Sequence, residues 1–122
     1  MSWEFENSTP IYRQIMKEIE LKIISGVYKS GEKIDSVRDL AKEASVNPNT
    51  MQKALTELER TGLIYSQRTS GRFITEDINM INQIKVSLAK DKVCEFINGM
   101  KNMGFSKDEV VLMVEEIVKE EK

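Results

Sequence analysis

The segment from Val46 to Thr75 constrains the fold most, because it joins a helix with a clear start and end to two strand-like runs around a glycine turn. Asn47 is a favourable N-cap, since its side-chain oxygen can accept from a free N–H of the first turn, and Pro48 suits the first helical position, where no N–H is needed. Gly62 can adopt the left-handed conformation that ends a helix. The sequence therefore predicts a helix from Pro48 to about Thr61.

One face of this helix is apolar and formed by Met51, Ala54, Leu55 and Leu58. The opposite face presents polar and basic side chains, namely Asn49, Lys53, Thr56 and Arg60, with Thr50 and Gln52 on its flanks. This mixture suits a DNA major groove, because amides can pair with adenine, a Thr methyl can touch thymine, and Lys or Arg can bind guanine or phosphate. Taken alone, the helix is equally consistent with a solvated face that has no function.

A short helix is predicted upstream, over Ser36 to Ala44. Ser36 and Asp39 have the spacing of a capping box, in which the Asp39 carboxylate accepts a hydrogen bond from the Ser36 N–H. A brief linker from Ala44 to Val46 then leads into the next helix. This pair of helices forms a helix-turn-helix unit, with Arg38 near the start of the first helix and placed to reach a phosphate.

A β-hairpin is predicted downstream, with strands over Leu63–Ser66 and Arg72–Thr75 and a turn over Gln67–Gly71. Arg68 and Arg72 flank its tip. Surface arginines often serve only solubility, but beside a helix-turn-helix they indicate a wing that follows the DNA backbone or enters a minor groove. The predicted fold is mainly α with a small β-hairpin: a winged helix-turn-helix over 8–75 and a helical region over 76–122.

Ordered motifs extend this pattern over residues 8–75: Pro10–Ile15, Ser25–Gly26, Gly31, Ser36–Ala41, Val46–Thr50, Ala54–Leu55, Leu58–Glu59, Gly62–Ile64 and Gly71. In them the chain resembles the N-terminal domain of the GntR family of bacterial transcription regulators. By that resemblance, DNA contact falls on Arg38, Asn49, Thr50, Gln52 and the wing around Gly71 and Arg72. Together with the residues chosen above, the expected DNA-binding set is Arg38, Asn47, Asn49, Thr50, Gln52, Lys53, Arg68, Ser70, Gly71 and Arg72.

The chain departs from the family pattern at four positions. Members commonly carry proline where this chain has Ser30 and Asp35, which is expected to loosen that loop. Many carry arginine where it has Asn49 and Gln52, which should change base preference. Fewer arginines also weaken the non-specific electrostatic attraction to DNA, so affinity should depend more on dimerisation and on correct bases.

Net charge agrees with this reading once it is divided along the chain. The whole sequence of 122 residues carries −2, whereas residues 1–75 hold 11 Lys and Arg against 10 Asp and Glu, giving +1. Residues 76–122 hold 7 basic against 10 acidic side chains, giving −3. The expected contact region can therefore be locally positive in a protein that is acidic overall.

A helical hairpin is predicted for the C-terminal region. Apolar positions indicate a helix from about Ile78 to Met103 that ends at Gly104, and Ser106 and Glu109 form a second capping box before another amphipathic helix. Two helices cannot enclose a core alone, so their stripes must pack on the winged helix or on another copy. Homodimerisation is favoured, through Ile81, Leu88, Phe96, Ile97, Met100, Val114 and Ile117.

Within the GntR family, so short a tail resembles the YtrA subfamily, which implies dimerisation through the tail and repression, often of transporter operons. The expected function is a sequence-specific dimeric repressor that binds an inverted-repeat operator in double-stranded DNA, with recognition helices about 34–36 Å apart. A small-molecule effector between the tail helices stays open. The alternative is a winged-helix module that binds protein without sequence-specific DNA binding.

Other classes of protein find little support. The chain has no histidine, no metal-ligand spacing and no phosphate-binding loop, so no enzyme, cofactor or metal site is expected. The sequence has no apolar run long enough for a membrane span, and its first residues, MSWEFENS, lack signal-peptide features, so a cytoplasmic protein without membrane contact is expected. The single cysteine, Cys94, is expected to be a small packing residue rather than a redox sensor.

The first helix is predicted to begin at Pro10, with Ser8 or Thr9 as its cap, and to stop at Gly26. It carries a core stripe at four-residue spacing, made of Ile11, Ile15, Ile19 and Ile23. Trp3 and Phe5 precede it. They are expected either to pack over the domain or a second subunit, or to belong to a partly ordered tail.

Overall fold

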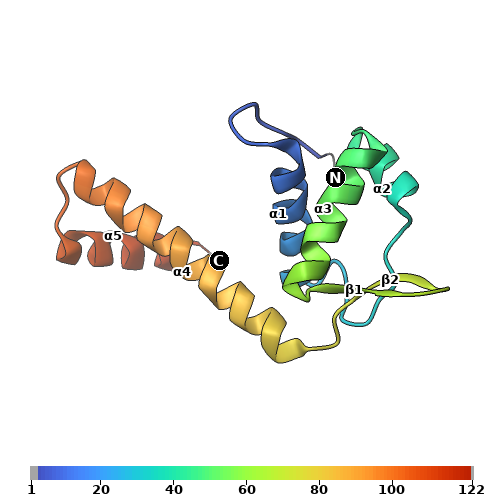
Figure 1. The fold of residues 1–122 in the computed structure, drawn as a ribbon. Coiled ribbons are helices and arrows are strands. Elements are labelled where there is room, and N and C mark those ends of the chain that lie inside the picture. The colour runs from blue at the N-terminus through green and yellow to red at the C-terminus, as the bar shows by residue number, and fades with distance from the viewer. Residues whose placement is uncertain (1–2, 122) are drawn as a thin grey trace. The chain divides into compact units, whose positions relative to one another are not determined.

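The structure is a computed structural model that describes residues 3–121. Within this range the chain forms five helices and one two-stranded antiparallel sheet (Figure 1). In chain order the elements are α1 (Ile11–Ile24), α2 (Val37–Ala44), α3 (Pro48–Thr61), β1 (Ile64–Gln67), β2 (Gly71–Ile74), α4 (Ile78–Asn102) and α5 (Lys107–Glu120). The predicted class, mainly α with a small hairpin, is confirmed.

Helix α3 has the predicted limits and the predicted caps. The Asn49 N–H donates to the Asn47 side-chain oxygen at 2.8 Å, and Gly62 ends the helix with φ of 87°. Its apolar residues Met51, Ala54, Leu55 and Leu58 are all 0% exposed. Because α3 packs against α1, α2 and β1, this apolar face forms the centre of the core.

The core stripe of α1 is confirmed at Ile15, Ile19 and Ile23, which are buried. The predicted cap is wrong, since the N-cap is Pro10 and no side chain caps it. Gln14 binds the preceding segment, since its Nε2 donates to the Thr9 carbonyl at 2.9 Å and its Oε1 accepts from the Glu6 N–H at 2.7 Å. These contacts fix the segment before α1 on the helix but do not cap it, because they leave the N–H groups of the first turn without a side-chain acceptor.

The segment before α1 packs on the winged helix. The Nζ of Lys22 lies 4.1 Å from the centre of the Trp3 ring, and Trp3 Nε1 donates to Glu43 of α2 at 2.9 Å. Lys22 also lies 5.6 Å from the ring of Tyr28. Burial, followed by the charge of Glu43, raises the pKa of Tyr28 to about 12, so this ring stays neutral beside the ammonium group. Trp3 therefore packs over the domain, which confirms one of the alternatives expected for it.

Helix α2 begins with half of the predicted capping box. Ser36 Oγ accepts from the Asp39 N–H at 3.1 Å. Among the hydrogen bonds of residues 3–121, none runs from the Ser36 N–H to the Asp39 carboxylate, so the reciprocal part of the prediction is wrong. The shorter Asp side chain occupies the position that the capping box usually gives to Glu. Ser45, with φ of 57°, then turns the chain into α3.

Strands β1 and β2 each lie one residue from the predicted limits. The ladder extends towards the tip, where Gln67 pairs with Gly71 and the Ser70 N–H donates to the Gln67 carbonyl at 3.1 Å. The loop is therefore shorter than expected and covers 68–70. The Thr75 N–H still donates to Leu63 at 2.8 Å, so the predicted outer residues remain paired beyond the strands.

The loop before α2 adds an edge to the wing that the sequence did not predict. Lys33 forms an isolated antiparallel bridge to Phe73, and the Ile34 N–H donates to the Arg72 carbonyl at 3.0 Å. The Ser30 hydroxyl donates to the Thr75 carbonyl at 2.9 Å. The loop is thus tied to the wing, and Ser30, where family members commonly carry proline, binds Thr75 just beyond the end of β2.

Helices α4 and α5 agree with their predicted bounds. Asp77 Oδ1 accepts from the Met80 N–H at 3.0 Å at the start of α4. The capping box of α5 is complete, because Ser106 Oγ accepts from the Glu109 N–H at 3.2 Å and Glu109 accepts from the Ser106 N–H at 2.9 Å. The chain divides into two compact units between Gln83 and Ile84, inside α4.

Candidate nucleic-acid interface

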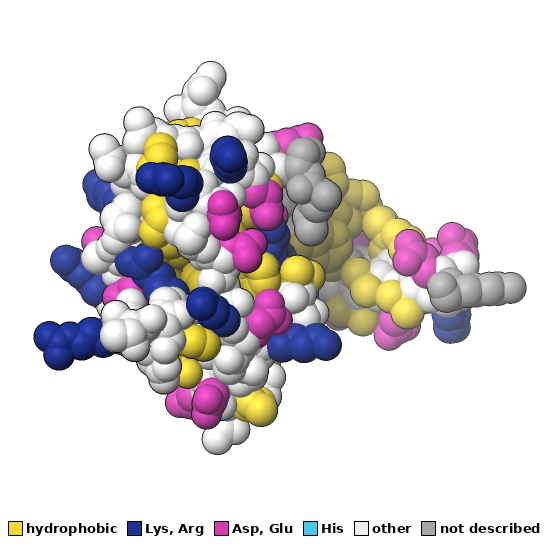
Figure 2. Space-filling model, turned by 90° about the vertical axis from the view of Figure 1, so that its right-hand side faces the viewer, with side chains coloured by type: hydrophobic (Ala, Val, Ile, Leu, Met, Phe, Trp, Pro, Cys, Tyr) yellow, Lys and Arg dark blue, Asp and Glu magenta, His cyan; other side chains and the backbone are white. Residues whose placement is uncertain are grey.

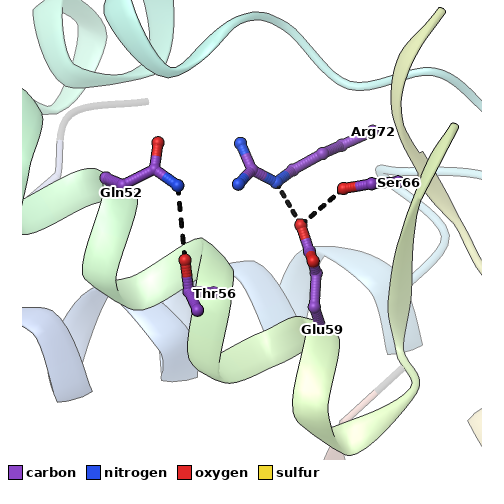
Figure 3. A network of polar contacts seen from close by, with 5 residues as sticks. All are labelled: Gln52, Thr56, Glu59, Ser66 and Arg72. Carbon is purple, nitrogen blue, oxygen red and sulfur yellow. Dashed lines mark hydrogen bonds and ion pairs between the residues drawn. The ribbon is translucent and has the colours of Figure 1, made fainter. Parts of the chain in front are cut away.

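The outer face of α3 presents the side chains expected to read bases. Asn49, Gln52 and Lys53 are exposed, and Thr50 is half-buried. Gln52 Nε2 donates to Thr56 Oγ1 at 3.3 Å, one helical turn further on (Figure 3). This weak contact orients the amide along the helix and leaves its oxygen available as an acceptor.

Lys53 is positioned by an aromatic ring that sequence reasoning did not connect with it. Its Nζ lies 4.1 Å from the centre of the Tyr12 ring at the start of α1. The guanidinium of Arg13 lies 5.5 Å from the same ring. A ring face attracts cations, so Tyr12 holds Lys53 in place. Arg13, on the same ring, adds a second positive charge beside α3.

Arg72 is not a free surface arginine, because its Nε donates to Glu59 Oε1 in the last turn of α3 (Figure 3). The same oxygen accepts from the Ser66 hydroxyl at 2.7 Å. Burial raises the pKa of Glu59, but the hydrogen bonds from Ser66 and Arg72 and the positive charge of Arg72 outweigh it and lower the pKa overall. Glu59 is therefore an ionised link between α3 and the wing.

The tip of the wing is exposed at Arg68, Thr69 and Ser70. Gly71 follows with φ of 109°, a conformation that side chains rarely adopt. A Cβ at this position would also meet Lys33 Cε at 3.1 Å. Glycine is thus required here by its backbone, and it brings Lys33 beside the wing as a basic residue that the sequence did not indicate.

An open groove separates the wing from the start of α2. Arg38 is exposed in the first turn of α2, as expected for a phosphate contact. The groove has cations and carboxylates on its walls, and it is lined by Lys33, Ile34, Asp35, Ser36, Val37, Asp39, Thr69, Ser70, Gly71 and Arg72. Figure 2, which views the side that carries α2 and the wing, shows Lys and Arg side chains spread over this face with Asp and Glu between them. The face is mixed rather than uniformly basic.

The expected DNA-binding residues of the two helices lie on the helices that the sequence assigned to them. Asn49, Gln52 and Lys53 lie on α3, and Arg38 lies on α2. Asn47 was also expected to contact DNA, but its side-chain oxygen already accepts from the Asn49 N–H as the cap of α3. Sequence reasoning missed Tyr12, Lys33 and Glu59, since no local pattern reveals a contact between residues far apart in the chain.

The helical hairpin exposes many apolar side chains. Of the expected dimerisation residues, Phe96, Val114 and Ile117 are exposed, whereas Ile81, Leu88 and Ile97 are half-buried. Met100 is only 8% exposed, so it has little surface left for a partner. Further exposed apolar residues on α4 and α5 are Ile78, Val86, Val93, Val111, Leu112 and Val118.

None of the described helices is long and apolar enough to cross a membrane. Cys94 is exposed on α4, so it is not a buried packing residue in the single chain.

The arrangement of α2, α3 and the hairpin defines a winged helix-turn-helix protein of the DNA-binding class. Comparisons with known proteins agree: residues 11–74 match the family described as bacterial regulatory proteins, gntR family. The chain is 34% identical to the HTH-type transcriptional repressor YtrA of Bacillus subtilis, over 91% of this chain and 86% of that protein. It belongs to the GntR family of bacterial transcriptional regulators.

Two solved structures extend this comparison. A GntR family transcriptional regulator from Listeria monocytogenes superposes with a TM-score of 0.84 at 40% identity, covering 92% of this chain and 98% of that one. The DNA-binding domain AraR(DBD), solved in complex with operator ORX1, superposes with a TM-score of 0.56 at 28% identity, covering 62% of this chain and 99% of that one. The likeness to the Listeria protein includes the C-terminal helices, whereas AraR(DBD) matches a shorter part.

Proposed function

We propose that this DNA-binding regulator is a dimeric repressor that recognises an inverted-repeat operator in the bacterial cytoplasm. The observation that carries the proposal is the outer face of α3, where exposed Asn49, Gln52 and Lys53 lie on a helix whose opposite face is fully buried. A rigid helix with readers on one side and core on the other is what major-groove recognition requires. Relatives support it, since YtrA is a repressor and AraR(DBD) was solved on an operator.

Each part of the interface has a proposed role. Asn49 and Gln52 read base edges, because their amides can donate and accept together. Arg38 and Lys53 bind phosphates and fix the register of α3 in the groove. The wing, with Arg68, Ser70 and the backbone at Gly71, lies along the DNA backbone. Repression follows from steric exclusion of polymerase at the operator.

The hairpin of α4 and α5 is the proposed dimerisation region. From Val110 to Val114 every residue of α5 is apolar, so apolar side chains lie around the helix and one neighbouring helix can cover only part of them. Val111, Leu112 and Val118 are 55%, 59% and 64% exposed. An apolar surface of this kind is characteristic of an interface, and a second copy would bury it while pairing two recognition helices.

Selection of bound duplexes from a random DNA pool, at near-physiological salt, tests the proposal. Enrichment of an inverted repeat with half-sites about one helical turn apart would support both the reading helix and the dimer. Retention of no duplex, or only of weak binding that salt abolishes without sequence preference, would contradict it and favour a winged helix that binds protein.

A further inference from the structure

Glu59 connects the recognition helix to both strands of the wing through one carboxylate oxygen (Figure 3). Ser66 on β1 and Arg72 on β2 are cross-strand partners in the ladder, and both donate to Glu59 Oε1. A single rung of the hairpin is therefore bound to the last turn of α3. No other side-chain hydrogen bond among the described residues joins α3 to β2.

Arg72 uses only part of its donor capacity in this contact. A guanidinium has five N–H donors, of which one is on Nε and four are on the two Nη atoms. Within residues 3–121, the hydrogen bond and the ion pair that Arg72 makes with Glu59 both use Nε, and no hydrogen bond of the Nη atoms is found. The side chain is 20% exposed, and in Figure 3 its terminal nitrogens point along α3 in the direction of Gln52. The end of the guanidinium thus lies on the side of the helix that carries the base readers.

A fixed arginine binds an anion at a smaller entropic cost than a free one. A long side chain loses conformational freedom when it is immobilised at an interface, and a planar guanidinium can bind a phosphate oxygen through its Nη atoms while Nε stays paired with a carboxylate. Lysine suits this role less well, because its three donors share one nitrogen atom and both partners would have to meet at that single point. The local geometry therefore suits a phosphate beside the bases that α3 reads.

We propose that Glu59 is a positioning residue, which holds Arg72 so that its Nη groups bind a DNA phosphate and which sets the angle of the wing on α3. This inference rests on the proposed function, because it needs the duplex to lie across α3 and the wing. It excludes the opposite role, in which Glu59 would withhold Arg72 from DNA. The two roles predict opposite changes in operator affinity when Glu59 is removed: weaker binding if it positions Arg72, and tighter binding if it withholds Arg72.

Glu57 offers a matched control on the same helix. It pairs with Arg60 at 3.6 Å in a surface i, i+3 contact and makes no hydrogen bond to the wing. Glu57→Ala therefore removes the same charge from α3 without releasing Arg72. The difference between Glu59→Ala and Glu57→Ala isolates the effect of the wing contact from the general gain expected when a carboxylate near DNA is removed.

The experiment measures operator affinity of the full-length protein over a series of salt concentrations, with the duplex that the wild-type protein selects. The variants are Glu59→Ala, Glu57→Ala, Arg72→Ala and the double variant Glu59→Ala/Arg72→Ala. We expect Glu59→Ala to bind about tenfold more weakly per subunit than Glu57→Ala, the loss of about one charged hydrogen bond. The plot of the log of the binding constant against log salt should become less steep by about 0.9 per subunit. The change should be the same in Glu59→Ala and Arg72→Ala, because both lose the same phosphate contact.

The double variant decides whether Glu59 acts through Arg72. If it does, Glu59→Ala/Arg72→Ala binds no more weakly than Arg72→Ala alone, whereas independent roles would multiply the two losses. Tighter binding by Glu59→Ala than by Glu57→Ala, or an unchanged salt slope, would overturn the inference while leaving the proposed function intact. If the wild-type protein selects no duplex, the proposed function fails and the inference fails with it.

Discussion

Ile117 is the position at which the proposed dimer can be tested with a worked magnitude. Its side chain is 51% exposed on α5, so a partner can bury only about half of it. Full burial of an isoleucine is worth about 1.5–3 kcal/mol, so the available half is worth about 1 kcal/mol. In a two-fold interface the residue counts once on each subunit, which gives about 2 kcal/mol per dimer.

Replacement by alanine should therefore raise the dimer dissociation constant by about 30-fold, since about 1.4 kcal/mol corresponds to a factor of ten. Ile117→Asp should raise it further, because each dimer would then bury two carboxylates without partners. Sedimentation equilibrium measures both constants directly. Operator binding should become more dependent on protein concentration in the same order, because two linked recognition helices bind better than one.

Glu116→Ala is the matched control, since it changes an exposed polar neighbour on the same helix. It should leave the dissociation constant unchanged. Circular dichroism separates loss of dimer from loss of helix. If Ile117→Asp keeps its helix content and the wild-type dissociation constant, α5 does not form the dimer interface through this face, and the reasoning from exposed apolar area is wrong.

Three further predictions concern the interface and the hairpin. Asn49→Ala should relax base preference at one operator position and cost about 1–3 kcal/mol there, as shown by sequencing of selected duplexes; an equal loss on all duplexes would remove its reading role. Tyr12→Ala should weaken operator binding about two- to fivefold per subunit, because Lys53 loses a cation–π contact worth about 0.5–1 kcal/mol, and Tyr12→Phe, which keeps the ring, should bind nearly as the wild type does. Hydrogen bonds from the Ser106 N–H and the Ser106 side chain lower the pKa of Glu109. Ionised Glu109 therefore stabilises α5 above its ordinary pKa, and this stabilisation is lost as the pH falls through the lowered pKa of the folded state. Helix content at acid pH should decrease in the wild type but not in Glu109→Gln, and equal titrations of the two would refute this.

Local signals were sufficient for most of the secondary structure. Asn47, Pro48 and Gly62 act within one turn of their own positions, so the bounds of α3 follow from the sequence alone. The same is true of the capping box at Ser106 and of the buried stripe on α1. Where a prediction failed, it concerned a side-chain contact and not the helix itself: α1 and α2 form, but the predicted cap of α1 and the reciprocal bond of Asp39 are not found within residues 3–121.

The composition of the candidate interface was also readable from the sequence, because α3 has one apolar face and its polar side chains must point the other way. The contacts that hold these side chains were not readable from the sequence. The sequence could not show that Lys53 lies over Tyr12 or that Arg72 is bound to Glu59, and it placed both basic residues as if they were free.

The difference has a physical reason. Caps, helical stripes and glycine turns depend on backbone groups a few residues apart, so the order of residues determines them directly. The contacts of Tyr12 with Lys53, of Glu59 with Arg72 and of Lys33 with the wing join positions that become neighbours only when the helices have packed. The sequence by itself determined which side chains lie on the outer face of α3 and on the wing, and the tertiary structure decided how those side chains are held.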